Sequence, residues 1–185
     1  MKKLLVLLSC FCLLFSCNEK DEFDKTVLDS QGEVMDREEK YIQAIDEYAF
    51  QGIQFDFGKT RSEIQARLGT PVKVVESEVQ NIHNPEQKDK LYMLYYEGLY
   101  IQLYHVVENG KELIISVEIS SDTYKIKYGI SIGTPLSDVK KILGEPDSGT
   151  EDTLRYNASE FVMGIVDFSL KNEKVAAIRW TFLLN

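Results

Sequence analysis

Phe57–Pro71 reads FGKTRSEIQARLGTP, and 75 residues later Ile132–Pro146 reads IGTPLSDVKKILGEP. The two stretches align without a gap and are identical at Gly58/Gly133, Ser62/Ser137, Leu68/Leu143, Gly69/Gly144 and Pro71/Pro146. Each predicts a short helix, since Thr60 with Glu63, or Thr134 followed by proline, is a start signal. Leu-Gly-x-Pro is a stop signal, because glycine accepts a left-handed backbone and proline cannot continue a helix. The chain therefore contains an internal repeat.

Beyond these helices the two copies stay aligned, now at an offset of 63 residues, with Leu91 matching Leu154 and Asn109 matching Asn172. The offset shortens because the first copy has a longer loop around residues 83–90. Runs rich in β-branched and aromatic residues predict three antiparallel strands in each copy. The predicted strands are residues 91–96, 99–107 and 112–119 in the first copy, and 153–158, 161–170 and 174–183 in the second.

A further helix is predicted ahead of the repeat. Asp36 with Glu39 forms a capping pair, an apolar stripe includes Tyr41 and Tyr48, and Gly52 ends the pattern. The predicted fold class is therefore α+β: two tandem repeats, each a short helix packed on a three- to four-stranded antiparallel sheet, with an extra N-terminal helix. The sequence leaves open whether the repeats form one continuous sheet.

The first 16 residues, MKKLLVLLSCFCLLFS, have the build of a secretory signal peptide: two lysines, an apolar run and a small residue. Leu14–Cys17 resembles the lipobox of bacterial lipoproteins, in which the cysteine becomes lipidated. The resemblance implies a lipid on Cys17 that anchors the protein to a membrane. The alternative is an ordinary signal peptide that is cut near Ser16.

Residues 17–34 are highly charged and predict a flexible tether after the lipidated cysteine. The run Lys20-Asp21-Glu22 resembles the export signal of Bacteroidota lipoproteins, which implies an outer-membrane lipoprotein in the cell envelope. Periplasmic and outward orientations both stay open. The predicted organisation is a signal peptide over 1–16, a tether over 17–34, and repeats over 35–122 and 123–185.

The composition excludes some partners. The net charge is −9, and it becomes −11 without Lys2 and Lys3 of the signal. A chain this acidic lacks the basic surface that nucleic acids require. All three cysteines, Cys10, Cys12 and Cys17, lie in or next to the signal, so the rest of the chain can form no internal disulfide.

The hairpin at Asn109-Gly110 predicts which face of the first sheet is buried. A three-residue loop, 108–110, would pair Leu103 with Ile115 and Ile101 with Val117, and so unite two apolar rows. By the same count Trp180 would lie opposite Gly164.

This register predicts an opposite face that carries Tyr92, Leu94, Tyr96, Tyr100, Gln102, Tyr104 and Ile114. Tyrosine is frequent in protein interfaces, because it offers a large contact area with a polar end. We therefore predict a protein-binding surface whose aromatic anchors are Tyr92, Tyr96, Tyr100 and Tyr104. The alternative is that residues 35–50 or the second repeat cover these tyrosines.

The repeated pattern resembles the SmpA/OmlA (BamE-like) family, small lipoproteins of the outer-membrane assembly machine. In tandem it is also similar to the β-lactamase inhibitory protein family, which binds an enzyme through aromatic residues on a sheet. The resemblance covers residues 53–183 and implies a binding role without catalysis. The chain has two copies where the assembly lipoprotein has one, and it lacks the inhibitor's disulfides, so neither family's partner is carried over.

No sequence motif for catalysis, a metal or a cofactor is present. Two histidines are too few for a histidine-rich metal site. The acids Glu76, Glu78, Glu86 and Asp89 flank the long loop and predict a solvated acidic face, with calcium as the alternative. Asp152-Thr153-Leu154 resembles a short O-glycosylation acceptor. The sequence therefore predicts a non-catalytic protein-binding or assembly module, and a binder of surface glycans or small ligands is the alternative.

Overall fold

A computed structural model describes residues 37–53, 56–81, 83–124, 126, 128–159 and 164–182. Three helices occur in this part of the chain: α1 (Arg37–Gln51), α2 (Arg61–Leu68) and α3 (Leu136–Leu143). The strands are β1 (Lys73–Gln80), β2 (Lys88–Tyr96), β3 (Leu99–His105), β4 (Glu112–Ile119), β5 (Ser148–Thr150), β6 (Thr153–Asn157), β7 (Gly164–Lys171) and β8 (Lys174–Phe182). The signal peptide, Cys17 and the tether lie outside the described residues.

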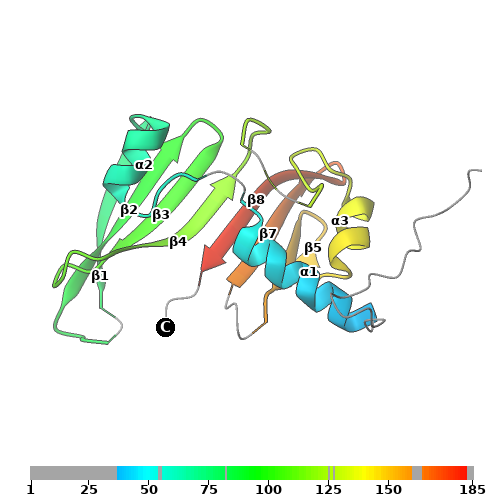
Figure 1. Cartoon of the computed structure of the whole chain (residues 1–185), viewed down its shortest axis with the longest axis horizontal. Helices are drawn as coiled ribbons and strands as arrows, with labels where there is room; N and C mark the ends of the chain where they lie inside the picture. The colour runs from blue at the N-terminus through cyan, green and yellow to red at the C-terminus, as the bar shows by residue number, and fades with distance from the viewer. Residues whose placement is uncertain are drawn as a thin grey trace, which may run out of the picture. The chain divides into compact units, whose positions relative to one another are not determined.

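All eight strands form one antiparallel sheet in the order β1-β2-β3-β4-β8-β7-β6-β5 (Figure 1). The prediction of two tandem helix-on-sheet repeats is therefore wrong. The last strands of the two copies pair with each other, with Val117 opposite Trp180 and Ile119 opposite Ile178. This pairing satisfies two strand edges that separate sheets would leave without hydrogen-bond partners. The predicted boundary at 122–123 falls in the connection between β4 and α3.

The predicted helices are confirmed, and so are the start signal of α2 and the glycine stop signals of α2 and α3. The predicted cap at Thr134 is wrong, because Pro135 is the N-cap of α3 and no side chain caps that helix. Asp36, the predicted cap of α1, lies outside the described residues. The Thr60 side chain accepts a hydrogen bond from the backbone N–H of Glu63, and the Glu63 carboxylate accepts one from the backbone of Thr60, which completes a capping box at α2. α2 and α3 end at Gly69 and Gly144, whose φ angles are +82° and +78°. Other residues rarely adopt such angles, so glycine is required at both ends.

The helices all pack on one face of the sheet, which we call the helix side. Ile64 of α2 and Val139 of α3 are fully buried. Tyr48 of α1 stacks on Phe168 and Trp180, with ring centroids 5.8 and 5.7 Å apart. Figure 1 shows α2 near β2 and β3, and α1 and α3 near the strands of the second copy. Buried residues of both halves form one continuous hydrophobic core.

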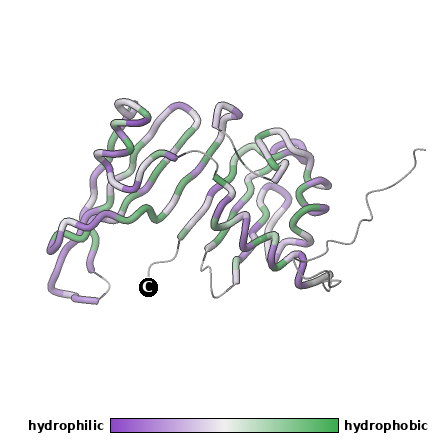
Figure 2. The backbone as a smooth tube through the Cα atoms, viewed as in Figure 1, coloured by the Kyte–Doolittle hydropathy of each residue, from purple (hydrophilic) through white to green (hydrophobic). Residues whose placement is uncertain are grey.

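Alternation along the strands assigns each side chain to a face. In β3, Leu99, Ile101 and Leu103 are buried on the helix side, and the residues between them point to the opposite face. Figure 2 shows this alternation of hydrophobic and hydrophilic residues along the strands. None of the three helices packs on the opposite face, which we call the open side, in the part of the chain that the structure describes.

The register of the β3–β4 hairpin differs from the prediction near the turn. The loop holds four residues, 107–110, and is closed by a hydrogen bond of 2.9 Å from the Val106 N–H to the Lys111 carbonyl. Leu103 pairs with Ile114, not with Ile115. A β-bulge at Ile115 adds one residue to β4 and restores the predicted pairing of Ile101 with Val117.

Trp180 lies opposite Val166, and the prediction that it faces Gly164 is wrong. Gly164 pairs with Phe182, and a β-carbon at Gly164 would lie 3.4 Å from the β-carbon of Ala49. The missing side chain of Gly164 therefore gives room to α1, not to the indole ring.

Candidate functional site

The open side carries one straight row of side chains across seven strands, which we call the central row. Its members pair in register from each strand to the next: Lys73, Tyr95, Tyr100, Glu118, Arg179, Asp167 and Arg155. Directly opposite residues of an antiparallel sheet lie on the same face, so the row forms one continuous strip. Only the joining of β4 to β8 brings the two halves of this row together.

The β1 to β3 end of the central row is aromatic. The ring centroids of Tyr95 and Tyr100 lie 5.1 Å apart at an interplanar angle of 50°. The Lys73 ammonium lies 5.4 Å from the centre of the Tyr95 ring, within the range of a cation–π contact. Burial raises the pKa of Tyr100 above its ordinary value.

The β4 to β6 end consists of two ion pairs. Arg179 Nε lies 2.7 Å from Glu118 Oε2, across the β4–β8 junction. Arg155 binds Asp167 through two hydrogen bonds of 2.6 and 2.9 Å. Such half-exposed pairs contribute little to stability. What matters for the surface is its charge: both carboxylates of the central row, Glu118 and Asp167, are neutralised by a neighbouring arginine.

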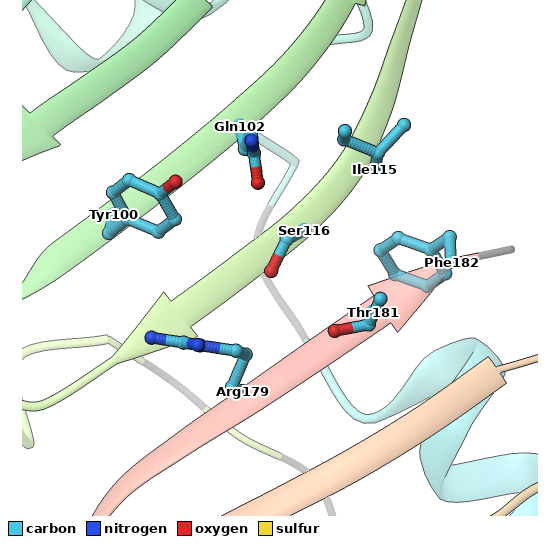
Figure 3. A pocket seen from close by; sticks show the side chains of 7 residues that line it. All are labelled: Tyr100, Gln102, Ile115, Ser116, Arg179, Thr181 and Phe182. Atoms are coloured by element: carbon cyan, nitrogen blue, oxygen red, sulfur yellow. The ribbon is translucent and has the colours of Figure 1, made fainter. Parts of the chain in front are cut away.

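Two shallow hollows lie beside the middle of the central row, and Tyr100 and Arg179 line both of them. The first has a volume of about 290 Å³ and is lined by Tyr100, Gln102, Ile115, Ser116, Arg179, Thr181 and Phe182. Figure 3 shows these side chains on three neighbouring strands, β3, β4 and β8. The second, of about 350 Å³, lies toward the β2–β3 turn, between Tyr95 and Ser120. The middle of the open side can therefore receive side chains of a partner.

The four predicted tyrosine anchors do not share a face. Tyr96 pairs with Leu99 across the two-residue turn, so Tyr96 and Tyr92 lie on the helix side. Tyr92 is buried under the Arg61 guanidinium, which is 4.0 Å from its ring centre. Tyr96 donates a hydrogen bond of 3.3 Å to the carbonyl of Gly69. The prediction that they share the open face with Tyr100 is wrong.

Tyr104 and Tyr100 do lie on the open side, but in different environments. Tyr104 is buried and donates its hydroxyl hydrogen bond to Asp89. Burial, together with the bond to Asp89, raises the pKa of Tyr104 to about 12. Tyr100 is half-buried and lines both hollows. Tyr96 borders the second hollow from the helix side, so Tyr100 is the one predicted anchor that lies on the open side and lines both hollows.

The sequence prediction missed Tyr95, Ile115 and Phe182. The predicted face of β2 is one residue out of step with β3, so the prediction turns Tyr95 away from the open side, where it pairs with Tyr100. Ile115 reaches the open side through the bulge, whose signal is the unbroken apolar run Leu113–Ile115. Phe182 borders the first hollow because β8 pairs with β4, a long-range contact that no local pattern encodes.

Asp89 forms a separate buried cluster near the β1–β2 loop. Its carboxylate accepts hydrogen bonds from Asn81 (2.6 Å), Gln87 (2.8 Å), the Val107 backbone N–H (3.0 Å) and the Tyr104 hydroxyl. Burial alone would raise the pKa of Asp89, but these donated bonds outweigh it and hold the pKa well below its usual value. Since both oxygens already accept two bonds each, the cluster serves to fix the loop.

Acid should destabilise the protein partly through Asp89. The folded state lowers the pKa of this carboxylate, so its contribution is present above the unfolded pKa of about 4 and is lost as the pH falls below that value. We expect Asp89→Asn to lower the melting temperature by several degrees at pH 7 and to flatten its decline between about pH 5 and 2. Thermal unfolding followed by circular dichroism against pH measures both effects. Parallel pH curves for the two proteins would contradict this role.

The other predicted acids are also placed by the structure. Glu76 pairs with Lys90 at 2.7 Å, and Glu78 pairs with Lys88 at 2.9 Å, while Glu86 is exposed. Among the described residues, no three histidine, cysteine, aspartate or glutamate side chains are grouped as a metal site would require. Thr153 of the glycosylation-like triplet is exposed and begins β6.

Comparison with known proteins found no matching family model, curated protein or solved structure. The resemblance to the SmpA/OmlA and inhibitor families therefore stays a prediction. Cys17 lies outside the described residues, and none of the described helices has the length and apolar character needed to span a membrane.

Proposed function

We propose that this chain is a non-catalytic binding protein of the bacterial cell envelope that engages a protein partner through the middle of its open side. A lipid on Cys17 would hold it at the outer membrane, and the tether over residues 17–34 would set its reach. The single observation that carries the binding role is the central row with its two hollows, at the face that no described helix covers.

The chemistry of this surface fits a protein interface. Interface centres are enriched in tyrosine and arginine and contain few unpaired charges. Tyr95 and Tyr100 supply aromatic area, Phe182 borders the first hollow, and Arg179 is already paired with Glu118. In a chain of net charge −9, this strip pairs both of its carboxylates with arginines. A partner can therefore cover it without burying an uncompensated acid.

Photo-crosslinking in living cells tests the proposal. A photoreactive residue is placed at Tyr100, at Thr181 in the same hollow, or at Gln65, which is exposed on α2 at the helix side. We expect one dominant protein adduct from positions 100 and 181, and none from position 65. Equal adducts at all three positions would contradict a specific surface.

The glycan alternative predicts no adduct in this experiment and sugar binding in a second one. Free sugars bound by the purified protein, with no protein adduct at positions 100 and 181, would replace the protein partner with a sugar ligand. The anchoring part is tested by Cys17→Ser, which should move the protein from the membrane fraction to the soluble fraction. These outcomes are independent, so the location and the binding role can fail separately.

A further inference from the structure

The sheet ends on one side in β1, a full strand whose outer edge carries no described neighbour. β1 pairs with β2 along all eight of its residues. The opposite end of the sheet is β5, which has only three residues. A long strand with an unpaired edge is a template for adding another strand, because its outward backbone groups lack hydrogen-bond partners.

In an antiparallel strand, every second residue points its backbone N–H and C=O groups toward the same neighbour. One hydrogen bond to β2 therefore shows which residues of β1 point these groups outward. The N–H of Asn81 donates to the carbonyl of Gln87 at 3.0 Å and continues the β1–β2 register by one residue. Backbone direction alternates along an antiparallel strand, so odd-numbered residues of β1 turn their backbone groups toward β2. Val74, Glu76 and Glu78 therefore turn their N–H and C=O groups away from the sheet.

The side chains along this edge define what can pair with it. On the helix side, Glu76 and Glu78 are 47% and 63% exposed, and each is held by a lysine of β2. On the open side, Val75 and Val79 are half-buried. On the helix side the sign of the charge therefore changes from one strand to the next, with lysines on β2 and glutamates on β1. A next strand would continue this pattern by placing cations beside the glutamates.

A second copy of the chain does not fit this edge. Outward backbone groups must meet outward groups, so even-numbered residues would pair with even-numbered ones. Two antiparallel registers obey this condition with the longest overlap of the two β1 strands. One places Glu76 opposite Glu76 of the other copy, and the other places Glu76 opposite Glu78. Like charges directly opposite each other are destabilising. The edge therefore favours a different chain with positive charge at alternate positions.

We propose that the outer edge of β1 binds an extended segment of a partner protein in which basic side chains alternate with apolar ones. Backbone bonds to Val74, Glu76 and Glu78 would give the affinity. The two glutamates would select the basic residues, and Val75 and Val79 would contact the apolar ones. This site is separate from the central row, so it goes beyond the proposed function.

The test uses the full-length chain in detergent and a labelled, end-capped peptide that alternates lysine with valine and threonine. Fluorescence anisotropy measures the affinity. Glu78→Pro removes one outward N–H and leaves the β1–β2 ladder intact, since proline is tolerated where the N–H faces outward. We expect binding to weaken roughly tenfold or more. The matched control Glu78→Ala removes the same carboxylate but keeps the N–H, and should weaken binding less.

Two further readouts locate the peptide. Hydrogen exchange should slow at the amides of Glu76 and Glu78 when the peptide is bound, and Tyr100→Ala should leave the affinity unchanged. A peptide with glutamate in place of lysine should not bind. Equal binding by Glu78→Pro and Glu78→Ala, or loss of binding in Tyr100→Ala, would overturn the edge site. Self-association that protects the same amides would overturn the choice of partner.

Discussion

Trp180→Ala is expected to lower the free energy of unfolding by about 4 kcal/mol, within the range for large buried aromatic residues. The indole is 1% exposed and stacks on Tyr48 of α1 at 5.7 Å. Its N–H donates a hydrogen bond of 3.1 Å to the Tyr48 carbonyl. Trp180 also pairs with Val117 across the β4–β8 junction. The substitution therefore weakens both the junction of the two halves and the attachment of α1.

Urea denaturation followed by far-ultraviolet circular dichroism measures this loss, because Trp180 is the sole tryptophan and fluorescence would disappear with it. Tyr48→Phe is the matched control on the other side of the same contact. It keeps the stacked ring and removes a buried hydroxyl that binds no described residue. We expect it to be neutral or to stabilise by about 1 kcal/mol. Equal destabilisation by the two substitutions would mean that the indole is not the central contact.

Tyr100→Ala is expected to weaken binding of the protein captured by crosslinking at position 100 roughly thirtyfold. This loss is typical of an aromatic side chain at the centre of an interface. Tyr100 contacts Tyr95 and lines both hollows, so its removal takes away one of the two rings at the aromatic end and a wall of each hollow. Its half-exposed ring contributes less to the core than Tyr92 does, and the fold should persist.

Surface plasmon resonance with the captured partner measures the change in affinity. Phe50→Ala is the matched control, since Phe50 is an aromatic residue that is 74% exposed on α1, at the helix side. We expect this control to bind as the unmodified protein does. Similar losses for Tyr100→Ala and Phe50→Ala would place the interface elsewhere or show a non-specific aromatic contact.

Local features of this fold could be predicted because their signals lie within a few residues. The capping box of Thr60 and Glu63 begins α2, and glycines with positive φ end α2 and α3. The alternating pattern predicted β4 with its observed bounds, β3, β6 and β8 nearly so, and most of β2 and β7, but it gave no β5. β1 was missed, because Val75, Ser77 and Val79 make only a weak apolar alternation between charged residues.

The faces of the strands were harder to predict. A shift of one residue moves every side chain of a strand to the other face. The ends of β2 and β3 at their shared turn are as predicted, but the predicted face of β2 is reversed, which misplaces Tyr92 and Tyr96. The bulge at Ile115 had a compensating effect, since it corrected a misjudged loop and left Ile101 opposite Val117. The candidate site was therefore predicted at Tyr100 and missed at Tyr95, Ile115 and Phe182.

The sequence by itself determined the repeated helix motif, the ends of the helices and the alternation of the strands, because each depends on neighbouring residues. Only the tertiary structure decided that β4 pairs with β8. That contact brings residues 116–119 beside residues 178–181, and it depends on edge hydrogen bonds and a shared core that neither copy contains alone. The same pairing sets Glu118 beside Arg179 and completes the central row, so the candidate site is a product of how the two halves join.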